Sequence, residues 1–280
     1  MANNFLEIKN IARQALPRLM ENLVFPHLVY KDFAEKNEMG KGSIIQVRKP
    51  VVLTAQEFSG TVTAQDVAEE SVEMHLDKLA TVDVAFGAIE RAANVDDLDR
   101  LFITPATAAL AEKINADGVA LFEQVTATTG AVEAASLTPF LTAAKVLNKA
   151  KVPLSPRYGV WSADAEAQFR TVPALINAEK CGSNEALRDG SIGRVFGIDN
   201  YMSQGVKGML GCVFHPYAFA FVTRPLAAPA GVESYTTSYN GITLRVTRGY
   251  DMKTKTEMLS MDVLYGYKLL DPMLAVKVTE

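Results

Sequence analysis

The chain has few of the residues on which several protein classes depend. Its 280 residues include only two cysteines, Cys181 and Cys212, which excludes a disulfide framework and suits a reducing compartment. Three histidines are few for a metal site with several imidazole ligands. No uncharged apolar stretch of about 18 residues occurs, which argues against a membrane-spanning helix. The first residues also lack the basic region and apolar run of a signal peptide.

Motifs that carry chemistry are equally scarce. There is no Walker A loop and no G-x-S-x-G elbow, and the cluster Gly190, Gly193 and Gly197 has the wrong spacing for a dinucleotide fingerprint. Cys212 and His215 stand three positions apart, but a closed zinc site needs four ligands. A buried thiol and a capping or core histidine are therefore the favoured interpretation. We expect an α+β protein that is not an enzyme and has no catalytic residue, cofactor or metal ion.

Three aspartates, Asp96, Asp97 and Asp99, precede the strongest helical region. They could bind a cation, but acidic residues near a helix N-terminus are also favoured by the helix dipole, and we prefer that interpretation.

The net charge of −4 is small, but its distribution is uneven. The first 50 residues hold eight bases and five acids, whereas residues 55–77 hold six acids and no lysine or arginine. These acids are Glu57, Asp66, Glu69, Glu70, Glu73 and Asp77. One hypothesis is that the acidic and basic segments pair between copies of the chain. The alternative is a solvated surface loop.

Apolar residues in the first 33 positions predict an N-terminal segment that needs a surface to lie on. Residues 5–23 have a helical apolar pattern, which we expect to break near Pro17, and residues 24–33 are apolar and aromatic. In a monomer this surface would be the chain's own core, and in an assembly it could be a neighbouring copy.

Two alternating runs predict a long-tipped β-hairpin. Ile45 and Val47 alternate with polar residues, and the chain returns with Val72, Met74 and Leu76 on one face. Glu73, His75 and Asp77 lie on the other face, and the alternation continues from Val82 to Phe86. A connection of about 20 residues between two strands is uncommon in a compact domain and usually functional.

The rest of the chain mixes helices and strands. Thr104-Pro105 predicts the start of a helix that runs to about Val125. Between 131 and 235 we expect short helices at 138–150, 163–170 and 174–180, strands at 157–161 and 193–202 (with a bulge at Gly197), and an apolar run at 212–222 that is interrupted at His215-Pro216. The last part predicts strands at 242–248, 258–268 and 274–278.

Four stretches, in this order, resemble the major capsid (coat) proteins of tailed bacteriophages, which have the Hong Kong 97 fold. They are residues 23–33 with 41–50, the strand-like run 193–203, the segment Val213-Phe214-His215-Pro216-Tyr217-Ala218-Phe219-Ala220, and the C-terminal strands with Asp271-Pro272. The resemblance covers nearly the whole chain. It implies an N-arm (1–40), an extended E-loop with flanking strands (41–90), a spine helix of the peripheral domain (91–130), an axial domain (131–235), peripheral-domain strands (236–270) and a C-terminal strand returning to the axial domain (271–280).

The function that the resemblance implies is structural. Copies would form pentamers and hexamers of an icosahedral shell that encloses double-stranded DNA without sequence-specific binding, assembled in the host bacterial cytoplasm with a portal protein. Glu57, Asp66, Glu69, Glu70 and Glu73 would lie on the E-loop as assembly residues. Gly40, Gly42 and Gly60 are candidate hinges for rigid-body rotation during shell expansion.

The chain departs from some relatives of this family. No fused scaffolding domain precedes the arm, so we expect either a separate scaffolding protein or a processed form. The segment 55–77 contains no lysine, so we expect no covalent link between subunits through the E-loop tip. Two alternatives remain: an encapsulin-type nanocompartment shell, which shares the fold, and a cytosolic α+β enzyme, for which the sequence offers no convincing set of titratable groups.

Overall fold

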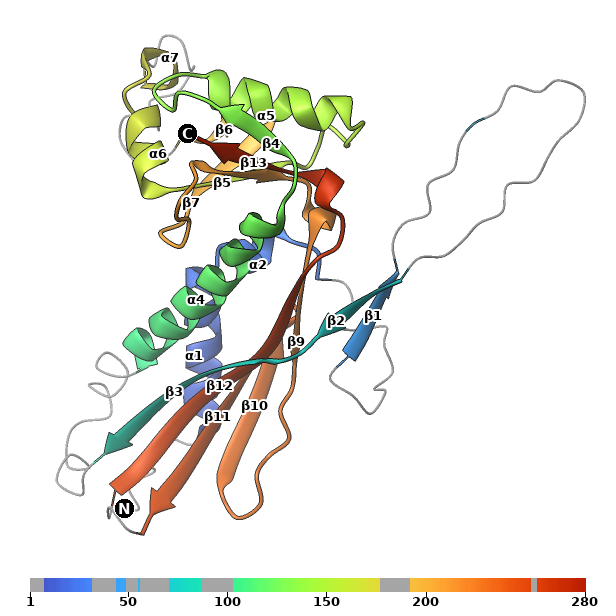
Figure 1. Ribbon diagram of the computed structural model, residues 1–280. Helices are drawn as coiled ribbons and strands as arrows, with labels where there is room; N and C mark the ends of the chain where they lie inside the picture. Colours follow the sequence, from blue (N-terminus) through green and yellow to red (C-terminus); the bar gives the residue numbers. More distant parts are fainter. Residues whose placement is uncertain are drawn as a thin grey trace, which may run out of the picture.

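Three β-sheets organise the chain in the structure, a computed structural model that describes residues 8–31, 44–48, 55, 71–86, 103–176, 192–252 and 256–280. Within these residues the sheets have two, five and six strands (Figure 1). Helices pack on the two larger sheets. The α+β class predicted from the sequence is confirmed.

The five-stranded sheet is antiparallel and has the order β10-β11-β12-β3, with β9 pairing to the far end of β12. Its strands are β3 (Lys78–Phe86), β9 (Phe219–Arg224), β10 (Glu233–Tyr239), β11 (Ile242–Asp251) and β12 (Thr256–Leu269). Alternate residues such as Leu244, Val246 and Met261 are buried. Helix α1 (Ile8–Asn22) packs on β10 and β11, and α4 (Thr104–Val119) packs on β3 and β12. The period-2 pattern thus places one face of the sheet under two helices.

The six-stranded sheet has the order β4-β13-β8-β5-β7-β6. Its strands are β4 (Thr128–Ala131), β5 (Tyr158–Trp161), β6 (Arg194–Val195), β7 (Ile198–Met202), β8 (Gly211–Phe214) and β13 (Ala275–Thr279). Helix α5 (Thr138–Lys149) packs on β4 and β13. Phe140 of α5 meets Trp161 of β5 and Phe169 of α6 (Ala163–Phe169) at ring-centroid distances of 4.9 and 4.6 Å. The short helix α7 (Pro173–Ile176) follows α6.

The chain passes between the two large sheets through short 3-10 turns. Turn η4 (Pro216–Ala218) connects β8 to β9, and η5 (Pro272–Leu274) connects β12 to β13. An aromatic cluster fills this junction; its rings are Phe25, Phe122, Phe214, Phe219 and Tyr267. Phe25 comes from the short helix α2 (Phe25–Leu28) and Phe122 from the 3-10 segment η3 (Ala120–Gln124). Because this cluster belongs to one core shared by both sheets, they pack as a continuous body.

The predicted hairpin is present as the two-stranded sheet β1 (Ile44–Arg48) and β2 (Ser71–His75), which are antiparallel. The predicted C-terminal strands are also present, as β11, β12 and β13.

Three local predictions are wrong. Helix α1 continues through Pro17, which is exposed, because the loss of one backbone donor is outweighed by the burial of Ala12, Leu16 and Leu19. Helix α4 ends at Val119 rather than near Val125, and the chain tightens into η3, which carries Phe122 into the aromatic cluster.

The third concerns a strand. Residues 193–202 are not one bulged strand but a β6–β7 hairpin that turns at Phe196-Gly197. By contrast, the interruption predicted at His215-Pro216 in the apolar run 212–222 is confirmed, because it separates β8 from β9, which belong to different sheets. The predicted boundary between the axial domain and the peripheral-domain strands, at residue 235, falls inside β10. Strand β4 joins the six-stranded sheet, although its residues overlap the range predicted for the spine helix, 91–130.

Candidate assembly surfaces

The β1–β2 hairpin has one buried face and one exposed face. In its register Ile45 is opposite Met74 and Val47 is opposite Val72. These side chains face a small core with Ala220, Val222 and Leu270. The other face presents Ile44, Gln46, Glu73 and His75 to solvent. The assignment of Val72, Met74 and Leu76 to the covered face is therefore confirmed.

The base of the hairpin crosses β12 at a position where only glycine fits. A Cβ atom on Gly266 would overlap the carbonyl oxygen of His75 and would lie 3.4 Å from the Cα atom of Leu76. A larger residue would push the end of β2 away from the five-stranded sheet. Gly266 thus fixes how closely the hairpin lies on the body, and the sequence analysis did not identify it.

A polar contact holds the strand that follows the hairpin. The Asp117 carboxylate of α4 accepts a hydrogen bond of 2.7 Å from the Tyr265 hydroxyl and lies 3.5 Å from Lys78 Nζ, at the start of β3. Lys113 Nζ lies 3.0 Å away on the same helix. Burial raises the pKa of Asp117, but these donors and positive charges outweigh burial, so the net pKa lies below its usual value. The carboxylate therefore stays charged and links α4, β3 and β12.

Most predicted assembly residues lie outside the described residues. They are Glu57, Asp66, Glu69 and Glu70, together with the hinge candidates Gly40, Gly42 and Gly60. Glu73 is described: it lies exposed on β2, opposite Gln46 of β1. The charge-pairing and hinge hypotheses remain predictions.

The N-terminal segment 8–31 packs on the chain's own core, which decides the alternative that the sequence left open for these residues. Asn115 Oδ1 accepts hydrogen bonds from the backbone N–H groups of Val24 and Phe25, at 3.1 and 3.2 Å. Its amide nitrogen donates to Asn22 O. The Phe25 ring fits where Gly118 has no side chain, since a Cβ there would lie 2.7 Å from Phe25 Cε1. The sequence held one signal for this contact, a glycine inside a helix, which indicates close packing.

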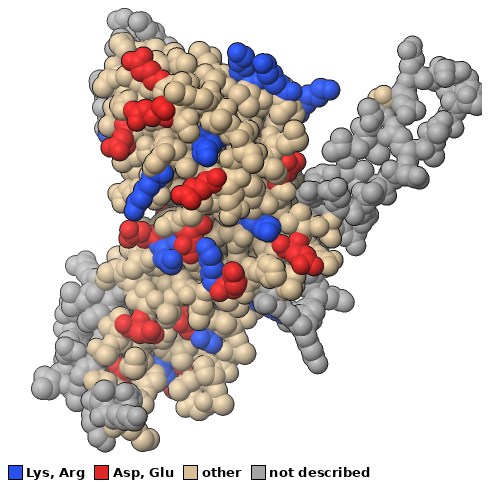
Figure 2. All heavy atoms as spheres, in the orientation of Figure 1, with Lys and Arg blue, Asp and Glu red and all other residues tan. Residues whose placement is uncertain are grey.

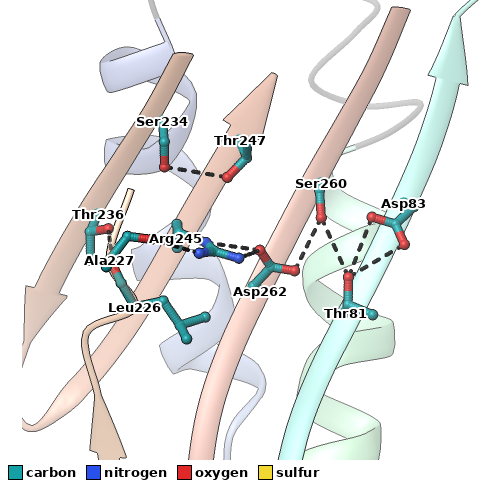
Figure 3. A network of polar contacts seen from close by, with 10 residues as sticks. All are labelled: Thr81, Asp83, Leu226, Ala227, Ser234, Thr236, Arg245, Thr247, Ser260 and Asp262. Carbon is teal, nitrogen blue, oxygen red and sulfur yellow. Dashed lines mark hydrogen bonds and ion pairs between the residues drawn. The ribbon is translucent and has the colours of Figure 1, made fainter. Parts of the chain in front are cut away.

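The polar face of the five-stranded sheet is bonded across its strands (Figure 3). Arg245 of β11 pairs with Asp262 of β12 at 2.6 Å and also donates to Ala227 O. Asp262 accepts from Ser260, which contacts Thr81 of β3. Arg248 and Glu257 form a second ion pair between β11 and β12. The bonds of Arg245, Asp262 and Ser260 tie β11, β12 and β3 together on the face that the helices leave uncovered. The Arg248–Glu257 pair lies on the opposite face, where Arg248 is in register with the buried Leu259.

The cysteine and histidine side chains that could take part in chemistry have structural roles in the described residues. Burial raises the pKa of the Cys212 thiol, which keeps it protonated and inert. His215 Nδ1 accepts a hydrogen bond from Tyr217 N at the start of η4, and burial with Arg157 nearby lowers its pKa. The interpretation of this pair as a buried thiol and a capping histidine is confirmed. Cys181 and the aspartates at 96–99 lie outside the described residues.

A groove of about 660 Å³ lies between α4 and residues 202–207. Its lining mixes small apolar residues, such as Ala111 and Ala116, with the charged residues Glu112, Glu123 and Lys207. In the described parts of the chain, no three histidine, cysteine or acidic side chains are placed to hold a metal ion. None of the described helices has the length and apolarity needed to cross a membrane.

The likeness to solved structures covers almost the whole chain, although no family model and no curated protein matches its sequence. The capsid structure of Mycobacterium phage Che8 superposes with a TM-score of 0.68 at 21% identity, over 91% of this chain and 90% of that one. The capsid of the cyanophage P-SCSP1u superposes with a TM-score of 0.61 at 16% identity, over 90% of this chain and 88% of that one. A virus-like particle from Pyrococcus furiosus superposes with a TM-score of 0.57 at 11% identity, over 96% of this chain and 98% of that one. The chain has the Hong Kong 97 capsid fold.

This fold agrees with the resemblance inferred from the four sequence stretches. The similar structures are capsids and particles rather than enzymes. Within the fold, the exposed face of the β1–β2 hairpin is the candidate assembly surface.

Proposed function

We propose that the chain is the major capsid protein of a tailed phage and that its copies form an icosahedral shell around double-stranded DNA. The observation that carries this proposal is the likeness to a phage capsid structure over 91% of the chain. The hairpin supports it, because a two-stranded sheet with an exposed face gains stability from a further partner. A second copy supplies that partner in a symmetric assembly.

The proposed partners follow from this role. Copies would associate as pentamers and hexamers, with a separate scaffolding protein during assembly and a portal protein at one vertex. The product would be the capsid of a virion, assembled in the host bacterial cytoplasm. The net charge of −4 suits a wall that encloses DNA without binding its sequence, since counterions neutralise most of the phosphate charge.

A second candidate is an encapsulin-type shell that carries protein cargo. The likeness to the virus-like particle from Pyrococcus furiosus, over 98% of that chain, favours it. The contents of the particle distinguish the two candidates, because one shell holds nucleic acid and the other holds protein. The third candidate, a cytosolic enzyme, would form a small oligomer instead of a particle.

The experiment is expression of the chain alone and with a scaffolding protein from the same genetic neighbourhood, followed by size-exclusion chromatography. The proposal predicts megadalton particles in at least one of the two samples. Particles from phage-infected cells should contain double-stranded DNA that resists added nuclease. A protein that elutes only as a monomer or small oligomer in both samples would contradict a shell function.

A further inference from the structure

The turn between β6 and β7 has an unusual residue at its tip. Val195 pairs with Ile198, so the turn consists of Phe196 and Gly197 alone. Both residues have positive φ, +49° and +79°. A two-residue hairpin turn with two positive φ values strongly favours Asn-Gly, because a bulky side chain is strained there.

The same chain follows this preference elsewhere. The β10–β11 hairpin turns at Asn240-Gly241, with φ values of +49° and +74°. Two turns with nearly equal φ angles therefore carry asparagine in one case and phenylalanine in the other. The phenylalanine is not explained by the turn geometry.

Burial within the described chain does not offset the strain either, because the Phe196 side chain is 53% exposed. Its ring borders a hollow of about 610 Å³ along the outer side of α5. The hollow also contains Leu141, which is 49% exposed, and its margin carries Lys145 and Lys149, one helical turn apart. We call Phe196, Leu141, Lys145 and Lys149 the α5 surface. It joins two exposed apolar side chains to two positive charges.

The charges of the six-stranded sheet domain are separated in space. Figure 2 shows lysine and arginine side chains gathered over one end of this domain, where α5 ends, and acidic side chains over the other end, near α6. Among the described acids, Asp164 is exposed in the first turn of α6. None of the ion pairs between described residues includes Asp164, Lys145 or Lys149. The two ends are therefore complementary between copies.

We propose that the α5 surface of one copy docks against the α6 end of a second copy. Phe196 and Leu141 supply the apolar centre of this contact, and Lys145 and Lys149 face Asp164 at the start of α6. The contact is head-to-tail, because each copy uses a different surface toward each neighbour, and such a contact closes into a ring when repeated with rotation. The inference rests on the proposed shell function and assigns residues to one of its contacts.

The decisive variant is Phe196→Asn. Asparagine tolerates the left-handed region, so the variant should melt at a temperature equal to or above that of the unchanged subunit. The same variant should lose most of its shells, with at least a tenfold fall in the particle fraction by sedimentation velocity. Asn240→Phe calibrates the strain: placed in the matched turn, phenylalanine should lower the melting temperature. Normal shells from Phe196→Asn, or a lower melting temperature of that variant, would overturn the inference.

Charge exchange tests the partner surface. Lys145→Glu with Lys149→Glu, and separately Asp164→Lys, should each reduce the particle fraction without lowering the melting temperature by more than a few degrees. A chain that combines all three changes should recover particles. Failure of the combined chain to recover would overturn the assignment of the α6 end. If the unchanged chain forms no particle under any condition, the proposed function itself fails, which is a different result from losing particles only in these variants.

Discussion

Gly118 lies inside helix α4, where alanine would ordinarily be the more stable residue. Its missing side chain leaves space for Phe25, which is 1% exposed and contacts four other aromatic rings. Because the ring is held on all sides, it cannot move to accept a methyl group. The interaction of a single glycine with a single ring thus fixes the N-terminal segment on the core.

Gly118→Ala should therefore destabilise the subunit by about 1–3 kcal/mol through overpacking. Alanine at an exposed helical glycine would instead stabilise by about 1 kcal/mol. Urea unfolding measures the difference. Combining Gly118→Ala with Phe25→Leu should cost less than the sum of the two single changes, and strict additivity would show that the residues do not compete for the same space.

Asp117 gives a pH dependence with a definite sign. Its pKa in the folded chain lies below the usual 3.8, so its contribution to stability is present above that value and is lost as the pH falls through the lower folded pKa. Asp117→Asn keeps the size of the side chain but removes the charge near Lys78 and Lys113. The variant should be less stable by about 1 kcal/mol or less above about pH 5.

The difference between the unchanged chain and Asp117→Asn should shrink as the pH is lowered toward 3. Urea unfolding at a series of pH values measures it, and comparing the two proteins cancels the titration of the other carboxylates. A difference that grows on acidification would contradict the charged state assigned to Asp117.

Sequence reasoning found the residues whose role is local. Val72, Met74 and Leu76 alternate with polar residues, and a strand places such residues on one face whatever else surrounds it. It did not find Asn115, Gly118 or Phe196. The partners of Asn115 and Gly118 are about 90 positions away in the chain, and the partner proposed for Phe196 is another copy.

At the scale of elements, errors occurred where packing outweighed local preference. The proline in α1 suggested a break, yet the helix is held by its buried apolar face. The predicted helix over 105–125 had the right start, but its last turn narrows so that Phe122 reaches the aromatic cluster. The β6–β7 hairpin was read as one strand because phenylalanine concealed the usual Asn-Gly signal at its turn.

The hairpin β1–β2 is the element whose position depends most on one residue of another strand. Gly266→Ala should place a methyl group against the His75 carbonyl oxygen and displace the hairpin base, at a cost of about 1–3 kcal/mol. Gly249→Ala on the neighbouring β11 is the matched control. Its Cβ would lie 3.8 Å from Val232, an ordinary contact, so it should be neutral or slightly stabilising.

Thermal unfolding of the two variants measures the contrast, and electron microscopy of their particles shows whether the displaced hairpin also impairs assembly. Equal melting temperatures for the two variants would mean that β12 and the hairpin base are not in close contact.

At the scale of the whole molecule, the two large sheets share one core through the aromatic cluster. Because one core joins both sheets, we expect shell expansion to occur by rigid-body rotation of whole subunits.

Residues 55–77 contain no lysine, and from this we predict a property of the assembled particles rather than of single subunits. Purified particles boiled in denaturant should migrate as single chains on a gel, because no lysine at the hairpin tip is available for a covalent link between subunits. A ladder of covalent multimers would defeat this prediction, while leaving the shell function itself intact.

The most direct test of the central claim is electron cryomicroscopy of particles purified from phage-infected cells or from co-expression with a scaffolding protein. The account predicts closed icosahedral shells in which this chain forms every pentamer and hexamer wall, with double-stranded DNA inside particles from infected cells. A sample in which the chain forms no closed shell, or a shell whose interior holds protein cargo and no DNA, would contradict it.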